Sequence, residues 1–341
     1  MKKIFILFIF TLFSFGCGNG SKSQTKNVDP LVVISYGRFG FHEFWESVVP
    51  VFEKKYDCKV KIKTAQGDTD ILEKIIDEKE NPSVDVAVGV PAEVLYEIRE
   101  ENIFESSSPS NYDSVKPYLI FDEDMFLIPF AYAYLAFVYD SEEIKEPPRS
   151  FGEIQDGIWK DKIIIVDPRT SDLGLSMLDW TVAQFGNNGY GHFWRAVKGN
   201  ILTIAKSGEE AYKMLRAGEA PIILTLDTRL SFYGKLDKSN RYKMFTVSEG
   251  SYIKTECIGK VKNCKNPELA EKFIEFMLTK DVQDKISYIR LMRPAVQNID
   301  LPRSFAGIPE PGNNVSKKLA PEIIGEKQKK WIKKWVSIMK K

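Results

Sequence analysis

Short apolar runs alternate with amphipathic segments along most of this chain. Runs of strand length occupy residues 31–36, 58–64 and 84–90, and a second set occupies residues 162–171, 201–207 and 221–228. The segments between them carry helical spacing of apolar positions, over residues 43–56, 69–81, 91–102, 173–186 and 208–220. Strand–helix repeats of this length predict parallel sheets with helices on both faces, which is the α/β class of fold.

The run FLIPFAYAYLAFVYD at 126–140 is too long and too apolar for one exposed strand. It predicts a strand that crosses from one lobe of the molecule to the next, and the strand-like stretch 242–261 is the candidate for the return crossing. A chain of 341 residues is also long for a single domain. We therefore expect two α/β lobes joined by two crossing strands. The expected boundaries are 31–130 with 251–300 for lobe 1, 131–250 for lobe 2, and 301–341 for a C-terminal helical segment.

The C-terminal segment ends in an amphipathic pattern. Trp331 and Trp335 are four residues apart, and lysines fill the opposite face. This pattern predicts a helix packed on the body of the protein through its tryptophans, with a membrane-surface helix as the alternative.

The first seventeen residues have the organisation of an export signal. Lys2 and Lys3 precede an apolar run from Ile4 to Phe15, which is too short to span a bilayer. The run ends at Gly16–Cys17, and the polar stretch 18–30 that follows is typical of a flexible tether. The arrangement resembles a bacterial lipoprotein signal, so residues 1–17 are the predicted signal peptide and Cys17 the predicted lipid attachment site. The alternative is ordinary cleavage with Cys17 incidental.

Composition and charge exclude several functions. Hydrophobic residues make up 43% of the chain, which excludes disorder for the bulk, and a net charge of +1 offers no overall attraction to nucleic acid. The two histidines, His42 and His192, are far apart, and no HExxH, CxxC, GxSxG or GxxxxGK[ST] motif occurs. We expect neither an enzyme nor a cofactor or metal site, but an exported, monomeric protein that closes on a small ligand.

The cysteines leave one question open. Cys257 and Cys264 are seven residues apart, a spacing that a strand-to-loop return can bridge in an oxidising compartment. Cys58 would then remain as a buried thiol. The sequence does not decide between the disulfide and two free thiols.

The turn VDPRTS at 166–171 is the clearest candidate binding element. It follows a strand and precedes a helix, so Thr170, Ser171 and Asp172 are candidates for the helix N-cap, beside amide groups that suit an anion. Capping alone and capping combined with ligand contact are both open. In parallel sheets ligands lie beyond the carboxyl ends of the strands, which places Tyr36 and the Gly67–Asp68 segment at a similar edge.

Five segments carry a resemblance to a known family: FAYAYLAFVYD, VDPRTSDLGLSMLDW, AKSGEEAYKMLRAGEA, VSEGSYIKTE and LMRPAVQNIDLP. With them the chain resembles the periplasmic thiamine-binding proteins of bacterial ABC importers, from about Leu31 to the WIKKW of the tail. The resemblance implies a two-lobed, type II-like periplasmic-binding-protein fold of the class shared with ferric-ion and polyamine binders. It implies capture of thiamine or a thiamine phosphate and delivery to a membrane permease and its ATPase, at the periplasmic or cell-surface face of a bacterial membrane.

The resemblance and the residues together give a candidate site. Tyr36 and Tyr132 are expected to offer aromatic faces to a thiazolium cation, and Asp68 a carboxylate. The predicted ligand-binding set is Tyr36, Gly67, Asp68, Tyr132, Ser171, Asp172, Asp227 and Thr228. The family's aromatic positions fall on Gly208, Leu226, Phe232 and Leu291 here, and its Asp falls on Ala131. We therefore expect specific binding that is weaker than in members with a complete aromatic cage.

Other ligands fit the same architecture. Asp227 with Asp68 would favour a cation such as a polyamine, and Arg38 with Ser171 would favour an anion such as a phosphonate. Ferric ion is a further alternative, although the chain has no adjacent tyrosine pair. A surface lipoprotein without a ligand is the alternative of a different class.

Overall fold

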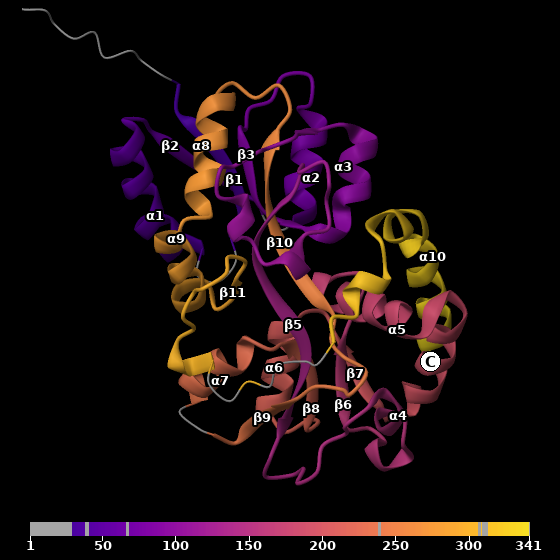
Figure 1. Ribbon diagram of the computed structural model, residues 1–341. Helices are drawn as coiled ribbons and strands as arrows, with labels where there is room; N and C mark the ends of the chain where they lie inside the picture. Colours follow the sequence, from indigo (N-terminus) through magenta and orange to yellow (C-terminus); the bar gives the residue numbers. More distant parts are fainter. Residues whose placement is uncertain are drawn as a thin grey trace, which may run out of the picture.

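The computed structural model describes residues 29–37, 41–65, 68–237, 240–305, 308 and 313–340. Two lobes, each with its own hydrophobic core, lie one above the other (Figure 1). The signal sequence, Cys17, the tether as far as residue 28 and Gly67 lie outside the described residues.

Strands and helices alternate in both lobes, as the apolar pattern predicts. The strands are β1 (Leu31–Tyr36), β2 (Val60–Ala65), β3 (Val86–Pro91), β4 (Phe104–Glu105), β5 (Ile128–Asp140), β6 (Ile163–Val166), β7 (Ile201–Ala205), β8 (Ile222–Leu226), β9 (Tyr242–Phe245), β10 (Ile253–Val261) and β11 (Arg293–Pro294). The helices are α1 (Phe41–Tyr56), α2 (Asp68–Asp77), α3 (Leu95–Glu101), α4 (Phe151–Ile154), α5 (Asp172–Val197), α6 (Gly208–Arg216), α7 (Arg229–Asp237), α8 (Pro267–Met277), α9 (Lys280–Lys285) and α10 (Pro321–Met339). A 3-10 helix, η1 (Ala92–Val94), joins β3 to α3.

One continuous sheet runs through both lobes in the order β2-β1-β3-β10-β5-β8-β6-β7. In lobe 1, β1 pairs in parallel with β2 and β3, and in lobe 2, β6 pairs in parallel with β7 and β8. These parallel pairs direct the carboxyl ends of their strands toward the space between the lobes (Figure 1).

The strand β5 joins the lobes and belongs to both. Its first half pairs with β10 and β11 of lobe 1, and its second half pairs with β8 and β9 of lobe 2. All of its residues are buried, so the long apolar run is explained by packing on both faces along its whole length. The predicted crossing strand is therefore confirmed, and β10 returns the chain to lobe 1.

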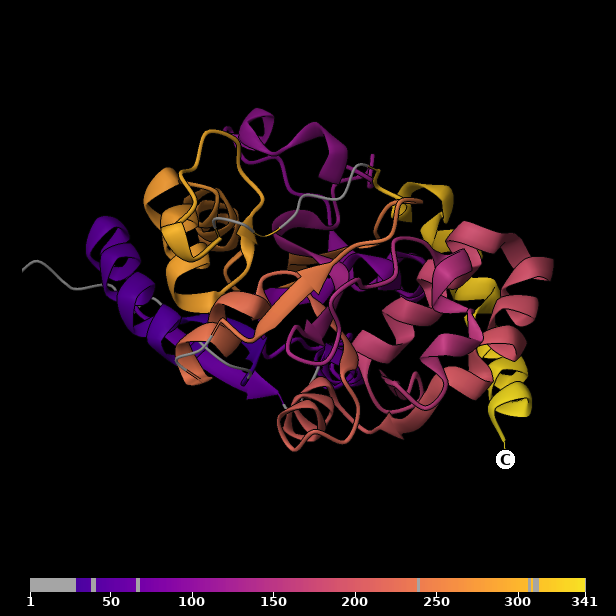
Figure 2. The same ribbon diagram turned by 90° about the horizontal axis from the view of Figure 1, so that it is seen from below.

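The C-terminal helix α10 lies beside α5 in both views (Figures 1 and 2), and it also contacts α3 and η1 of lobe 1. Trp331 and Trp335 are 2% and 1% exposed, and the Trp335 ring packs edge-on against Trp194 of α5. Gly325 approaches Tyr96 of α3 so closely that a Cβ atom would lie 2.2 Å from the ring. The tryptophan face thus packs on the protein body, as predicted.

Other details differ from the expectation or decide an open point. The helix predicted to end near Gly186 does so, because Gly186 has non-helical backbone angles, φ +71° and ψ 171°, and a second helical segment of α5 then continues to Val197. Cys257 and Cys264 are buried free thiols, and Cys58, expected to be buried, is half-exposed. Within the residues that the structure describes, no helix has the length and apolar character needed to cross a membrane.

Candidate functional site

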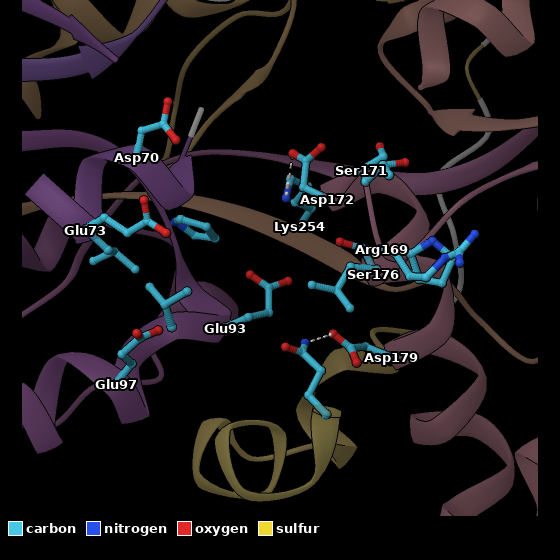
Figure 3. Close-up of a pocket in the computed structure, with 17 residues that line it drawn as sticks. Asp70, Glu73, Glu93, Glu97, Arg169, Ser171, Asp172, Ser176, Asp179 and Lys254 are labelled. Carbon is cyan, nitrogen blue, oxygen red and sulfur yellow. Dashed lines mark hydrogen bonds and ion pairs between the residues drawn. The ribbon is translucent and has the colours of Figure 1, made fainter. Parts of the chain in front are cut away.

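A cavity of about 560 Å³ opens between the two lobes. One wall comes from α2, the end of β3, η1 and α3, and the other comes from the 168–172 turn and α5, with Lys254 of β10 and Gln328 of α10 closing the space. Asp70, Glu73 and Glu97 lie along one side, Ser171, Ser176 and Asp179 along the other, and Glu93 between them (Figure 3). A cavity of this volume is large enough for a small organic ligand.

The turn before α5 is held in place by its own residues. Arg169 forms an ion pair with Asp167, 2.6 Å between Nη2 and Oδ2, and its backbone N–H donates to the same carboxylate. Gly174 is required here, because a Cβ atom would lie 2.5 Å from the carbonyl oxygen of Val166. The first turn of α5 can therefore approach the end of β6 closely.

Ser171 occupies the N-cap position of α5 but makes no side-chain cap hydrogen bond. Its hydroxyl lies on the cavity wall beside the start of a long helix, where backbone N–H groups and the helix dipole favour an anion. Of the two roles left open by the sequence, the side chain of Ser171 does not perform the capping role. The helix start can therefore interact with the contents of the cavity.

Asp172 and Lys254 form a partly buried ion pair across the joint between lobes. The Lys254 ammonium lies 3.2 Å from the Asp172 carboxylate, and Asp172 also accepts the backbone N–H of Leu173. Lys254 comes from the return strand β10, so this pair ties the start of α5 to the crossing strands.

Asp179 is the most deeply buried carboxyl group of the cavity wall. It is 1% exposed, and its Oδ2 accepts a hydrogen bond from the Gln328 amide at 3.0 Å, while Oδ1 has no hydrogen-bond partner among the described residues. Burial and the neighbouring Glu93 carboxylate raise the pKa of Asp179 well above its usual range, against the opposing effects of Gln328 and Lys254. Glu93 itself lies beside the Tyr252 hydroxyl.

The cavity is thus polar at both ends. The α5 start, with Arg169 and Ser171, suits an anionic or hydroxyl group, whereas Glu93 and Asp179 suit a group that donates hydrogen bonds or carries positive charge. Among the described parts of the chain, no group of three or more His, Cys, Asp or Glu side chains is arranged to hold a metal ion.

Two members of the predicted ligand-binding set line this cavity, and a third lies at the start of a helix that forms part of its wall. Ser171 and Asp172 line it directly. Asp68 is the first residue of α2, whose Asp70, Leu72 and Glu73 contribute to the lobe 1 wall.

Tyr36 lies outside the cavity wall, in a buried polar cluster of lobe 1. Its hydroxyl donates to the Glu256 carboxylate, which also accepts from Arg290 at 2.6 Å. The Arg290 guanidinium stacks on the Phe41 ring, 3.3 Å from its centroid. The Tyr36 ring also packs edge-on against Phe41, so its aromatic face is in contact with protein.

Asp227 and Thr228 lie at the end of β8 and are fully buried. Asp227 accepts the Tyr134 backbone N–H at 2.8 Å and forms an ion pair with Arg293 of β11 at 2.7 Å. Burial raises the pKa of Asp227, while Arg293 opposes that shift. The charge of Asp227 is therefore engaged by Arg293.

Tyr132 is buried on β5, with its hydroxyl 2.8 Å from that of Tyr118 and the Lys116 ammonium 5.0 Å from its ring centroid. Burial raises the pKa of its hydroxyl group. It too lies outside the cavity wall, so the structure brings together the Ser171 turn and α2 but not the tyrosines.

Sequence reasoning missed Glu93, Asp179, Lys254 and Gln328. Asp179 carried a signal, since it is the single charged residue in the mostly apolar helical run LSMLDWTVAQF. Glu93 in a helix start and Gln328 in a lysine-rich helix are ordinary surface patterns, so only the packing of η1 and α10 brings them to the cavity.

The chain matches the family model described as bacterial extracellular solute-binding protein over residues 81–309. It is 31% identical to the thiamine-binding periplasmic protein of Brucella melitensis, with 98% of each chain covered. It is 30% identical to the protein of that name from Salmonella typhimurium, over 85% of this chain and 86% of the relative. The chain therefore has full-length similarity to proteins with one shared description.

Solved structures give the same result for the fold. A periplasmic thiamin binding protein matches with a TM-score of 0.79 and 27% identity, covering 91% of this chain and 96% of that one. A ferric binding protein from Campylobacter jejuni matches with a TM-score of 0.77 at 17% identity, over 90% of this chain and 99% of that one. The predicted two-lobed periplasmic-binding-protein fold is confirmed.

The buried Asp179 yields a stability prediction. Because its pKa is raised in the folded protein, the folded state holds a proton that the unfolded state has released, so stability falls as pH rises from about 4 toward the raised value. We expect Asp179→Asn to increase the free energy of unfolding at pH 7.5 by about 1 kcal/mol, since it removes a buried, half-satisfied carboxylate. The gain should shrink toward pH 4. Denaturant titrations of both proteins at several pH values measure it, and a variant less stable than wild type at pH 7.5 would contradict this reasoning.

Proposed function

The chain belongs to the bacterial extracellular solute-binding protein family, and we propose that it captures thiamine or a thiamine phosphate between its two lobes. It has a periplasmic substrate-binding role and works with the permease of an ABC importer. Its relatives named for thiamine binding extend over nearly the whole chain, which supports this ligand.

The observation that carries the proposal is the cavity between the lobes with its two unlike ends. Thiamine has a hydroxyethyl or phosphate group at one end, an aminopyrimidine ring at the other, and a permanent thiazolium cation between them. The α5 start with Ser171 suits the first group, and the carboxylates that line the cavity suit the cation and the amino group. We propose Ser171 and Asp172, with Gly67 and Asp68 on the facing lobe, as ligand contacts.

The residues that line the cavity favour recognition of the ligand by charge rather than by aromatic stacking. None of the described residues that line the cavity is aromatic. The family resemblance implies a Trp at the position of Gly208, where a Cβ atom would lie 3.0 Å from Leu173. Each missing cation–π contact is worth about 0.5–2 kcal/mol, so we expect binding weaker than in an aromatic cage.

A phosphonate is the second candidate ligand. The chain is 21% identical, over 79% of its length, to a putative 2-aminoethylphosphonate-binding periplasmic protein of Salmonella typhimurium. Its phosphonate would suit the start of α5, and its amino group would suit a carboxylate of the cavity lining.

The remaining parts of the proposal concern the protein's surroundings. We propose that the mature chain is a monomer, lipid-anchored through Cys17, without catalytic activity, and that an ATPase drives its permease. The apolar leader, Gly16–Cys17 and the polar tether support the anchor.

Calorimetry with thiamine, its monophosphate, its diphosphate and 2-aminoethylphosphonate tests the ligand. We expect the thiamine compounds to bind, and Ser171→Ala to weaken the phosphates by about tenfold, which corresponds to one charge-assisted hydrogen bond. Ser337→Ala, on the exposed face of α10, is the matched control and should bind as wild type does. If 2-aminoethylphosphonate binds and none of the thiamine compounds does, the thiamine proposal is wrong and the second candidate ligand is favoured.

Closure of the lobes gives a second test. A ligand that contacts both lobes favours the closed form through its higher affinity for that form. We expect a smaller radius of gyration in X-ray scattering at saturating thiamine than without ligand. If calorimetry shows that the protein is saturated and the radius of gyration is unchanged, the lobes do not close on the ligand.

The anchor is tested in cells. Cys17→Ser should abolish incorporation of a fatty-acid label and release the protein from the membrane fraction, whereas Cys58→Ser should leave both unchanged. If the label persists in Cys17→Ser, the lipid is not attached at this residue.

A further inference from the structure

The inner part of the cavity holds two carboxyl groups from opposite lobes. Glu93 comes from η1 of lobe 1, and Asp179 comes from α5 of lobe 2, two helical turns beyond the start of that helix. Figure 3 shows both side chains on the cavity, with Glu93 extending between the lobe 1 acids and α5. Because the lobes contribute one carboxyl group each, a ligand that contacts both would connect them.

Asp179 has a hydrogen-bonding capacity that the protein leaves unused. Its side chain is 1% exposed, Oδ2 is occupied by the Gln328 amide, and Oδ1 has no partner among the described residues. A buried carboxyl oxygen without a partner is unfavourable for folding. A group of this kind on the wall of an open cavity indicates that a bound molecule supplies the missing hydrogen bond.

We propose that Glu93 and Asp179 form the subsite for an amino-substituted heteroaromatic ring, which in the proposed ligand is the aminopyrimidine. The inference rests on the proposed function and goes beyond it by assigning the orientation of the ligand. The amino group donates to the carboxyl oxygens of the two residues, and the opposite end of the ligand reaches the α5 start at Ser171.

The spacing along α5 supports this orientation. Ser171, Asp172, Leu175, Ser176 and Asp179 all line the cavity, which is one face of the helix at a repeat of three and four residues. Eight residues separate Ser171 from Asp179, or about 12 Å along the helix axis. An extended thiamine phosphate has its amino and phosphate groups far enough apart to use both ends, whereas 2-aminoethylphosphonate, with two carbons between its charges, is too short.

The electrostatics of Asp179 suit an amino group. Burial and the Glu93 carboxylate raise the pKa of Asp179, because both disfavour its charged form. A bound group that donates a hydrogen bond or carries positive charge opposes both effects. The groups that face Asp179 are Glu93 from η1, Gln328 from α10, and Lys254 with Tyr252 from the β10 region.

A comparison of thiamine with oxythiamine, whose ring carries an oxo group in place of the amino group, tests the subsite. Wild type should prefer thiamine by about 10-fold or more, because the oxo group would face carboxyl oxygens. In Asp179→Asn the single side-chain oxygen accepts from the Gln328 amide, and an NH2 group takes the place of Oδ1, so this variant should lose most of the preference. Glu93→Gln should reduce it from the other lobe. Asp113→Asn makes the same chemical change at an exposed position of a short 3-10 helix in lobe 1 and should keep the preference.

The outcomes separate this inference from the function on which it rests. If wild type binds thiamine and both cavity variants keep its preference over oxythiamine, the subsite is wrong and the ligand stands. If the variants lose affinity for both compounds equally, the residues shape the cavity without recognising the amino group, and the inference again fails. If wild type binds neither compound, the proposed ligand fails, and the assignment of its ring fails with it.

Discussion

The pairing of β5 with strands of both lobes is the constraint on which the rest of the structure depends. Its first half is hydrogen-bonded to β10 and its second half to β8, so one fully buried strand fixes the positions of both halves of the sheet. The parallel strands on either side end at the space between the lobes, and the turn that carries Ser171 follows one of them. A cavity at that place is a consequence of the strand order, since the carboxyl ends of parallel strands from both halves of the sheet meet there.

A buried ion pair holds the middle of this joint. Asp227, at the end of β8, bonds the backbone of Tyr134 and the guanidinium of Arg293, whose strand β11 is paired with β5 on the lobe 1 side. Removing one partner of such a pair is expected to cost about 3–5 kcal/mol, because the other charge is left buried. Fixing the strands at this point limits relative movement to rotation about the joint. The helix α10, which contacts both lobes, restricts that rotation on one side.

The fold could be predicted from the sequence to a greater extent than the site. Periodicity predicted the strand–helix order, the crossing strand and the docked tryptophan helix, because each depends on burial that repeats along a short segment. The cavity depends on side chains from segments far apart in sequence, such as Glu93, Asp179 and Gln328, which only the packing of α10 against both lobes brings together. Tyr36 and Asp227 show the reverse. Both lie at the carboxyl ends of strands, where ligand-binding residues are expected, yet Tyr36 is bonded to Glu256, the partner of the buried Arg290, and Asp227 is paired with the buried Arg293.

The buried carboxyl group at position 179 indicates that the cavity is adapted to bind a ligand rather than to stabilise the fold. The preceding and following residues, Leu178 and Trp180, are fully buried apolar side chains, and a leucine at 179 would remove a carboxyl group that the fold leaves half-satisfied. The protein instead keeps that group near Glu93, whose carboxylate disfavours the charged form of Asp179. Burial away from bulk water strengthens any interaction with a bound donor. The same arrangement that weakens the empty protein therefore favours a ligand with an amino-bearing ring, and it can replace part of the stacking energy that an aromatic cage would supply.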